Sequence, residues 1–124
     1  MISIEEMEIM LDEIANEFPM EFYKDLNGGI IILPEFKMHS KSVNNDLFIL
    51  GEYHFNMSLG RYIIIYYGSF SRVHGFLSKG KFKEKLKSVL KHEFRHHIES
   101  LAGERGLEIE DEKSIAKYLK NKKL

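Results

Sequence analysis

The feature that most constrains the fold is a long apolar stripe between residues 81 and 102. Apolar side chains recur there at intervals of three and four residues, which is the repeat of an amphipathic α-helix. Gly103 follows directly and suits the end of such a helix. We therefore predict a helix from Lys81 to Ala102 with one face in the core. The stripe consists of Phe82, Leu86, Val89, Leu90, Phe94, Ile98 and Leu101.

The remaining segments predict an α+β domain. Ser3 and Glu6 have the spacing of a capping box at the start of a helix over 3–17. A loop is expected over Ser69–Lys79, and a last helix from about Glu110 to Leu119. Short segments rich in β-branched and aromatic residues predict a small mixed or antiparallel sheet, with the last two segments forming a hairpin. These strands are expected at Ile30–Leu33, Leu47–Phe55 and Arg61–Tyr67.

The composition narrows the class of protein. A chain of 124 residues with 44% apolar side chains fits one domain, taken as 1–124. The formal charge of −1 gives no general attraction to nucleic acid or anionic lipid. The chain has no cysteine, so a metal ion would have to be held by histidine and carboxylate. Without an apolar run long enough to span a bilayer, we expect a cytoplasmic protein with no membrane partner.

The motif that indicates chemistry is His92-Glu93-Phe94-Arg95-His96, an H-E-x-x-H sequence inside the long predicted helix. Histidines four residues apart on a helix present their imidazoles on one face, where both can bind a single Zn²⁺. The intervening Glu93 can reach the water that zinc makes more acidic, and can act as its general base. The motif predicts His92 and His96 as metal ligands and Glu93 as the catalytic residue.

The helical repeat also predicts which of these side chains are buried. At about 100° per residue, Glu93 falls inside the apolar stripe, while His92 and His96 lie at its edge beside Val89. A carboxylate on a buried face is costly unless it is paired or has a function there. The plain alternative is a solvated helix with a polar edge. His97 also lies within the stripe, and we interpret it as a hydrogen-bonded core histidine.

A catalytic zinc ion usually has a third protein ligand and one open position. An acidic cluster from Glu108 to Glu112 follows the helix after two glycines. On the last predicted helix, Asp111 and Glu112 share the side of the apolar residues, so either would face the motif if the two helices form a hairpin. Asp111 is the predicted ligand, with Glu112 and Glu108 as alternatives. A simple helix cap would also explain Asp111.

The sequence HEFRHHIESLAGERGLEIEDEKSIAKYL, preceded by LGEY and RYIIIYYGSF, resembles the small bacterial zincin-like metallopeptidase family. The resemblance covers most of the chain, and HEFRHH is its most specific part. It implies a minimal zincin-like fold and zinc held by the two motif histidines and a downstream aspartate. Glu99 stands where many relatives have a glycine. If SLAGERGLE is an insertion, the aspartate of the family falls on Asp111.

Together these observations predict a zinc metallopeptidase that acts on a peptide or protein. Segment 61–67 would suit an edge strand that binds an extended peptide, or equally a central strand. One alternative is a zincin-like protein that binds metal without catalysis, and another is a zinc hydrolase acting on a different amide or ester. A third is a module that binds nucleic acid or an acidic partner through the lysines between 79 and 91, although a solvated helix face explains them better. The oligomeric state is left open.

Overall fold

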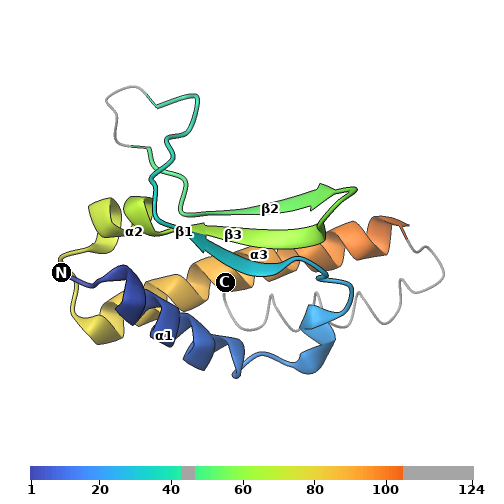
Figure 1. Ribbon diagram of the computed structural model, residues 1–124, viewed down its shortest axis with the longest axis horizontal. Coiled ribbons are helices and arrows are strands. Elements are labelled where there is room, and N and C mark those ends of the chain that lie inside the picture. The colour runs from blue at the N-terminus through green and yellow to red at the C-terminus, as the bar shows by residue number, and fades with distance from the viewer. Residues whose placement is uncertain (43–46, 105–124) are drawn as a thin grey trace.

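A three-stranded mixed sheet lies against the long helix in the computed structural model, which describes residues 1–42 and 47–104 (Figure 1). The predicted α+β class and mixed sheet are confirmed. Within these described residues, two further α-helices and one 3₁₀ helix accompany the sheet and the long helix. In chain order the elements are α1 (Ile4–Ala15), η1 (Met20–Tyr23), β1 (Gly29–Leu33), β2 (Gly51–Asn56), β3 (Gly60–Tyr66), α2 (Tyr67–His74) and α3 (Lys79–Glu104).

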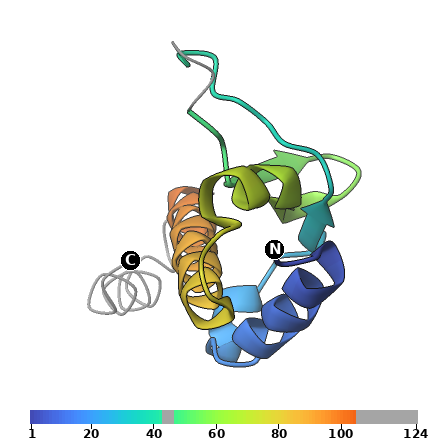
Figure 2. The same ribbon diagram turned by 90° about the vertical axis from the view of Figure 1, so that its left-hand side faces the viewer.

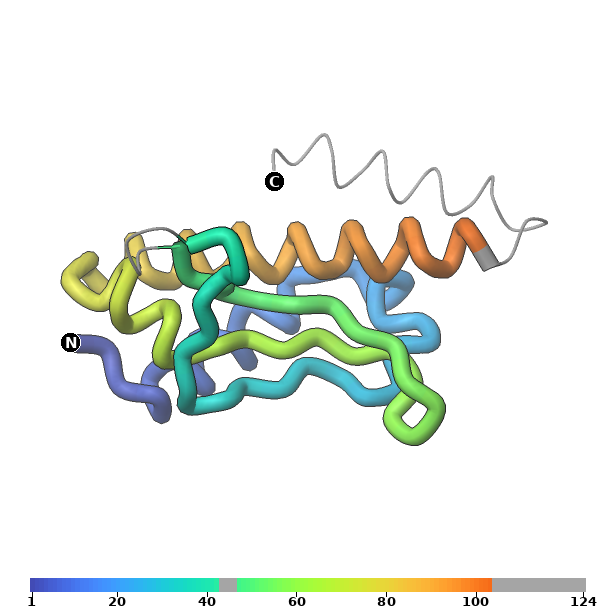
Figure 3. The backbone as a smooth tube through the Cα atoms, turned by 90° about the horizontal axis from the view of Figure 1, so that it is seen from above, coloured from blue at the N-terminus to red at the C-terminus, as the bar shows by residue number. Residues whose placement is uncertain are grey.

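The strand order is β1-β3-β2, so the segment RYIIIYY is the central strand and not an edge. β3 runs parallel to β1, with Ile31 opposite Ile64, and antiparallel to β2, with Tyr53 opposite Ile63. β2 therefore has a strand on one side only within the described residues. Figure 3 shows α3 running alongside β2, on the side away from β3. This placement brings the H-E-x-x-H helix next to a sheet edge.

The core lies between one face of the sheet and the helices α1 and α3, which Figure 2 shows from the end of the molecule. Ile63 and Ile65 of β3 point into it and are fully buried. From α3 the apolar stripe enters the core as predicted, with Phe82, Leu86 and Phe94 fully buried. The helix has 26 residues and is therefore about 39 Å long, so it runs along the whole sheet.

The capping box predicted at Ser3 is present. The Ser3 Oγ accepts a hydrogen bond from the Glu6 backbone N–H at 3.1 Å, and the Ser3 backbone N–H donates to Glu6 Oε1 at 3.0 Å. The helix that it begins is covered by α3, and ion pairs join α3 to α1 and to Glu17, two residues beyond the end of α1. They are Lys79–Glu6 at 2.7 Å, Lys83–Glu13 at 3.4 Å and Lys87–Glu17 at 2.6 Å. These lysines are thus placed opposite acidic residues of the same chain, which weakens the case for a nucleic-acid-binding face.

The predicted loop over Ser69–Lys79 is wrong, because residues 67–74 form α2 and α3 begins at Lys79. The helix is held by tertiary packing: Phe70 is fully buried, with its ring 5.7 Å from that of Phe82. Its first turn also packs directly against the backbone of residues 35–36. A Cβ atom on Gly68 would lie 2.6 Å from the Glu35 carbonyl carbon. No side chain caps its N-terminus, so a local sequence signal was missing.

The other predicted elements differ only at their ends. β2 begins at Gly51 and not at Leu47, and α3 extends the predicted helix by two residues at each end. The predicted helix at Glu110–Leu119 lies outside the described residues. Within the part of the chain that is described, no helix is long and apolar enough to cross a membrane.

Candidate metal-binding and catalytic site

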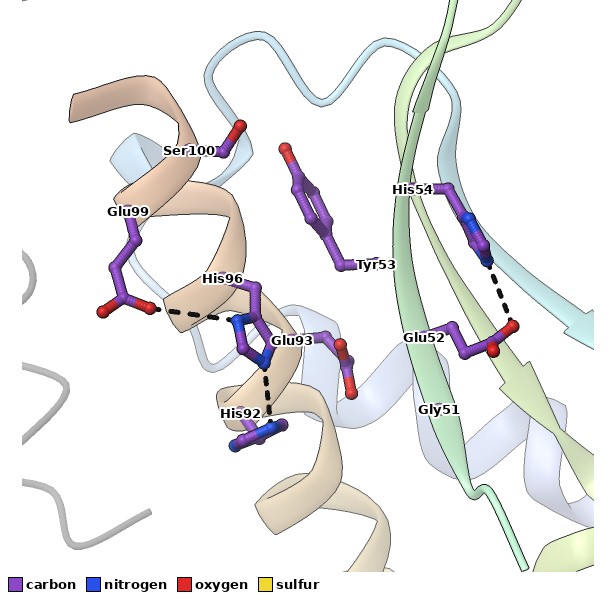
Figure 4. A pocket seen from close by; sticks show the side chains of 9 residues that line it. All are labelled: Gly51, Glu52, Tyr53, His54, His92, Glu93, His96, Glu99 and Ser100. Carbon is purple, nitrogen blue, oxygen red and sulfur yellow. Dashed lines mark hydrogen bonds and ion pairs between the residues drawn. The ribbon is translucent and has the colours of Figure 1, made fainter. Parts of the chain in front are cut away.

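A pocket of about 650 Å³ lies between α3 and the edge strand β2, and the H-E-x-x-H residues line its helical wall (Figure 4). The opposite wall comes from the first four residues of β2. The lining consists of Gly51, Glu52, Tyr53, His54, His92, Glu93, His96, Glu99 and Ser100. The structure thus brings the three predicted motif residues to one cavity.

His92 and His96 point toward one another at the helical wall of the pocket. Their Nε2 atoms are 3.0 Å apart, and their rings meet edge to face with centroids 4.5 Å apart. Two nitrogen ligands of a tetrahedral zinc ion, each at about 2.0–2.1 Å, are roughly 3.3 Å from one another. Burial, with a smaller effect of the His96 charge, lowers the pKa of His92 and favours the neutral form that ligates a metal. The pair therefore fits a single ion.

Glu99, one turn beyond His96, stands on the other side of the His96 ring. Its Oε1 lies 3.8 Å from His96 Nδ1 (Figure 4), too far for a hydrogen bond but within ion-pair distance. Carboxylates commonly take this place beside ligating histidines, where they favour the tautomer whose other nitrogen faces the metal. Glu99 is thus the acidic side chain that lies beside the second ring nitrogen of His96.

Glu93 is the unusual residue of the site. Its side chain leaves α3 toward β2 and enters the pocket (Figure 4), and the residue is only 4% exposed. The described residues supply its carboxylate with no hydrogen bond and no ion pair. Burial, and secondarily the negative charge of Glu52, raise the pKa of Glu93 to about 7. A buried carboxylate without a partner is costly, and such groups are concentrated at functional sites.

His97 is the core histidine that the helical repeat predicted. It is fully buried, with its Nε2 2.7 Å from the Lys24 carbonyl oxygen and its Nδ1 2.7 Å from the Tyr53 hydroxyl. A carbonyl oxygen only accepts, so Nε2 carries the hydrogen and Nδ1 accepts from Tyr53. His97 therefore fixes the rotation of α3 relative to β2 and to the end of η1, and with it the direction of its neighbours.

The third metal ligand stays a prediction. Asp111, Glu112 and Glu108 all lie outside the described residues. Within residues 1–42 and 47–104, no group of three or more histidine, aspartate or glutamate side chains is arranged to hold a metal ion. Among the described residues, the site therefore holds two candidate ligands, His92 and His96, and one candidate base, Glu93.

Sequence reasoning missed the contribution of β2 to the pocket. Tyr53 points toward α3, whereas Glu52 and His54 point away from it (Figure 4). Burial alone would raise the pKa of Glu52, but hydrogen bonds from Lys37 at 2.7 Å, Tyr66 at 2.6 Å and His54 at 3.0 Å lower it to about 2. The alternation of side chains along a strand could have shown that Tyr53 faces the opposite way from Glu52 and His54. It could do so only once β2 was known to lie beside the motif helix.

The fold and site together define a small α+β protein in which a long helix presents paired histidines to a sheet edge. No protein-family model matches the chain, and no curated protein matches it. A solved structure, a conserved hypothetical protein from Thermo thermophilus, is 31% identical with a TM-score of 0.71. The match covers 82% of this chain and 99% of that one. The chain belongs to the same family as that protein.

Proposed function

We propose that the protein is a zinc-dependent hydrolase of minimal zincin-like fold and that it cleaves peptide bonds. One observation carries the proposal. The Nε2 atoms of His92 and His96 lie 3.0 Å apart, in the same pocket as a buried Glu93 carboxylate that has no partner among the described residues. Two convergent nitrogen donors beside an unpaired base are the parts that metal-assisted hydrolysis requires.

His92 and His96 would hold the zinc ion, and Asp111 is proposed as the third ligand. The chemistry that zinc supplies when bound is polarisation of a carbonyl group and a lower pKa for water. Glu93 takes a proton from the water whose oxygen attacks the carbonyl carbon. It then passes that proton to the leaving nitrogen as the carbon–nitrogen bond breaks. The products are one carboxylic acid and one amine, and Glu93 returns to its starting state.

The edge of β2 supports a peptide as the substrate. The Tyr66 N–H donates to the Leu50 carbonyl at 3.0 Å, so the backbone groups of Leu50 face β3. Because these directions alternate along an antiparallel pair, the backbone groups of Gly51 and Phe55 point away from β3. An extended peptide can pair with such an edge by strand addition. At Gly51 this would bring it beside His92 and Glu93, which line the same pocket.

The first test is zinc content of the purified protein by elemental analysis. We expect close to one zinc per chain, lost in His96→Ala and kept in His39→Ala, a matched control at an exposed histidine outside the pocket. If zinc cannot be loaded, or if it survives in His96→Ala, the proposed site is wrong.

The second test separates metal binding from catalysis. Zinc-loaded wild-type protein should cleave members of a peptide library, followed by mass spectrometry, and Glu93→Gln should keep zinc while losing cleavage about 100-fold or more. Stoichiometric zinc with no turnover of any peptide would instead indicate a protein that binds metal without peptidase activity.

A further inference from the structure

The outer edge of β2, which faces away from β3, is open along its second half. From Gly51 to Phe55, every second residue turns its backbone N–H and C=O away from β3. No hydrogen bond joins the backbone N–H of Gly51 or Phe55 to another described residue. Glu52 and His54 line the pocket although their side chains point away from α3 (Figure 4), so it is the strand backbone that faces the pocket there. This stretch can therefore pair with an extended peptide.

Immediately before Gly51, the same outer edge is already occupied. The Ile49 backbone N–H donates to the Lys37 carbonyl oxygen at 2.8 Å, and a second backbone hydrogen bond of 2.8 Å joins the other ends of the two segments. An antiparallel bridge lies between these bonds. Segment 37–39 thus takes the place beside 47–49 that a peptide strand would need.

The candidate catalytic residues stand at the boundary between the open and the occupied edge. A Cβ atom added to Gly51 would lie 2.9 Å from Val89 Cγ1, so β2 and α3 are nearly in contact at this level. Gly51, His92 and Glu93 line the 650 Å³ pocket and also a second hollow of about 480 Å³. The bond that Glu93 and the metal would attack consequently lies level with Gly51.

We propose that the site holds a peptide by strand pairing on one side of the scissile bond only. Residues on that side, called the paired side, pair with β2 between Glu52 and Phe55. Residues on the other side would pass segment 47–49, where the described residues leave no strand edge to pair with. A peptide whose scissile bond lies next to one terminus is then held as tightly as one extended at that terminus. This inference rests on the proposed peptidase function and adds which part of an oligopeptide the protein recognises.

Phosphinic peptides test the proposal, because their phosphinate resembles the transition state, binds zinc at the position of the scissile bond and so fixes the register. A common alanyl-phosphinate-alanine centre is extended by successive alanines, at its N-terminus in one series and at its C-terminus in the other. Calorimetry with zinc-loaded protein gives the Kd. In one series, each of about four added residues should tighten binding about threefold, the effect of roughly one backbone hydrogen bond. The other series should gain less than about twofold in total.

Amide hydrogen exchange followed by NMR locates the pairing without any turnover. In the free protein, exchange should be slow at the bonded Ile49 N–H and fast at the Phe55 N–H. The longest peptide of the gaining series should slow exchange at Phe55 about tenfold or more and leave Ile49 unchanged. Unchanged exchange at Phe55 in the saturated complex would contradict the proposed pairing.

The variant Phe55→Pro assigns the gain in affinity to the strand edge. Proline has no N–H, and edge strands tolerate it where that N–H faces away from the sheet. The variant should reduce the gain of the paired series about threefold. Met57→Pro, at a hairpin residue that is 94% exposed and outside both hollows, is the matched control and should keep the gain. Because short and long peptides are compared within one variant, a general loss of metal or fold cancels.

Equal gains in the two series, or no gain in either, would overturn the inference while leaving the proposed zinc site intact. So would a gain that Phe55→Pro leaves at its wild-type value. If the zinc-loaded wild-type protein neither binds any phosphinic peptide nor cleaves any peptide, the proposed function is wrong and this inference with it.

Discussion

On α3, each of the two exposed histidines of the motif is followed directly by a buried polar residue. His92 and His96 lie at the pocket wall with their Nε2 atoms turned toward each other. Glu93 and His97 are buried, at 4% and 0% exposure. His97 has protein partners at both ring nitrogens, whereas the described residues offer the Glu93 carboxylate none. Two similarly buried polar groups on one helix therefore differ in whether the described residues give them a partner, which marks His97 as structural and Glu93 as a candidate for a functional role.

The largest expected effect tests the structural half of this comparison. His97→Ala removes a fully buried ring together with its hydrogen bonds to the Tyr53 hydroxyl and the Lys24 carbonyl. We expect a loss of about 3 kcal/mol in the free energy of unfolding of the metal-free protein. His92→Ala, by contrast, should cost less than about 1 kcal/mol there. Urea denaturation with a chelator measures both, and equal losses would abolish the distinction.

For the Glu93 carboxylate we predict the opposite change in the free energy of unfolding. Glu93→Gln replaces a buried charge with a neutral side chain of the same size, so it should stabilise the metal-free protein by about 1–2 kcal/mol at pH 8. The same denaturation series measures it. Destabilisation by this substitution would mean that the carboxylate has a structural partner after all.

Glu52 sharpens the comparison, because it borders the same pocket and is fully paired. Its pKa is lowered in the fold to about 2 by Lys37, Tyr66 and His54, despite burial, against about 4.3 in an unfolded chain. A lowered folded pKa gives stability that is present above pH 4.3 and is lost as the pH falls toward 2. Its contribution is on the order of 1–2 kcal/mol. Glu52→Gln should therefore destabilise the protein at pH 7 and flatten its acid unfolding curve over that window.

The smallest effect concerns the exposed ion pairs. Lys87→Ala removes the 2.6 Å contact with Glu17 on the surface between α1 and α3. We expect a change of about 0.5 kcal/mol or less, because exposed pairs gain little after solvent screening. Thermal unfolding in low and high salt checks this, and a change above about 1 kcal/mol would show that the helix pairing depends on these charges.

The helical half of the site was predictable because its geometry is local. The 3.6-residue repeat places Glu93 and His97 inward and His92 and His96 at the edge, and all four positions agree with the structure. The contribution of β2 was not predictable, because strand order depends on pairings distant in sequence. RYIIIYY has the strongest strand signal, yet the strand that faces the motif is the less regular GEYHFN. The third ligand predicted at Asp111 remains a prediction.

The absence of a side chain at Gly51 allows β2 and α3 to lie close together at this position. The smallest side chain at this position would come within 2.9 Å of Val89 Cγ1 and 3.3 Å of the Ile64 carbonyl oxygen, so the strand or the helix would have to shift. The spacing of His92 and His96 lies within α3 and would stay unchanged, so a single methyl group at residue 51 should alter the width of the pocket between β2 and α3 alone.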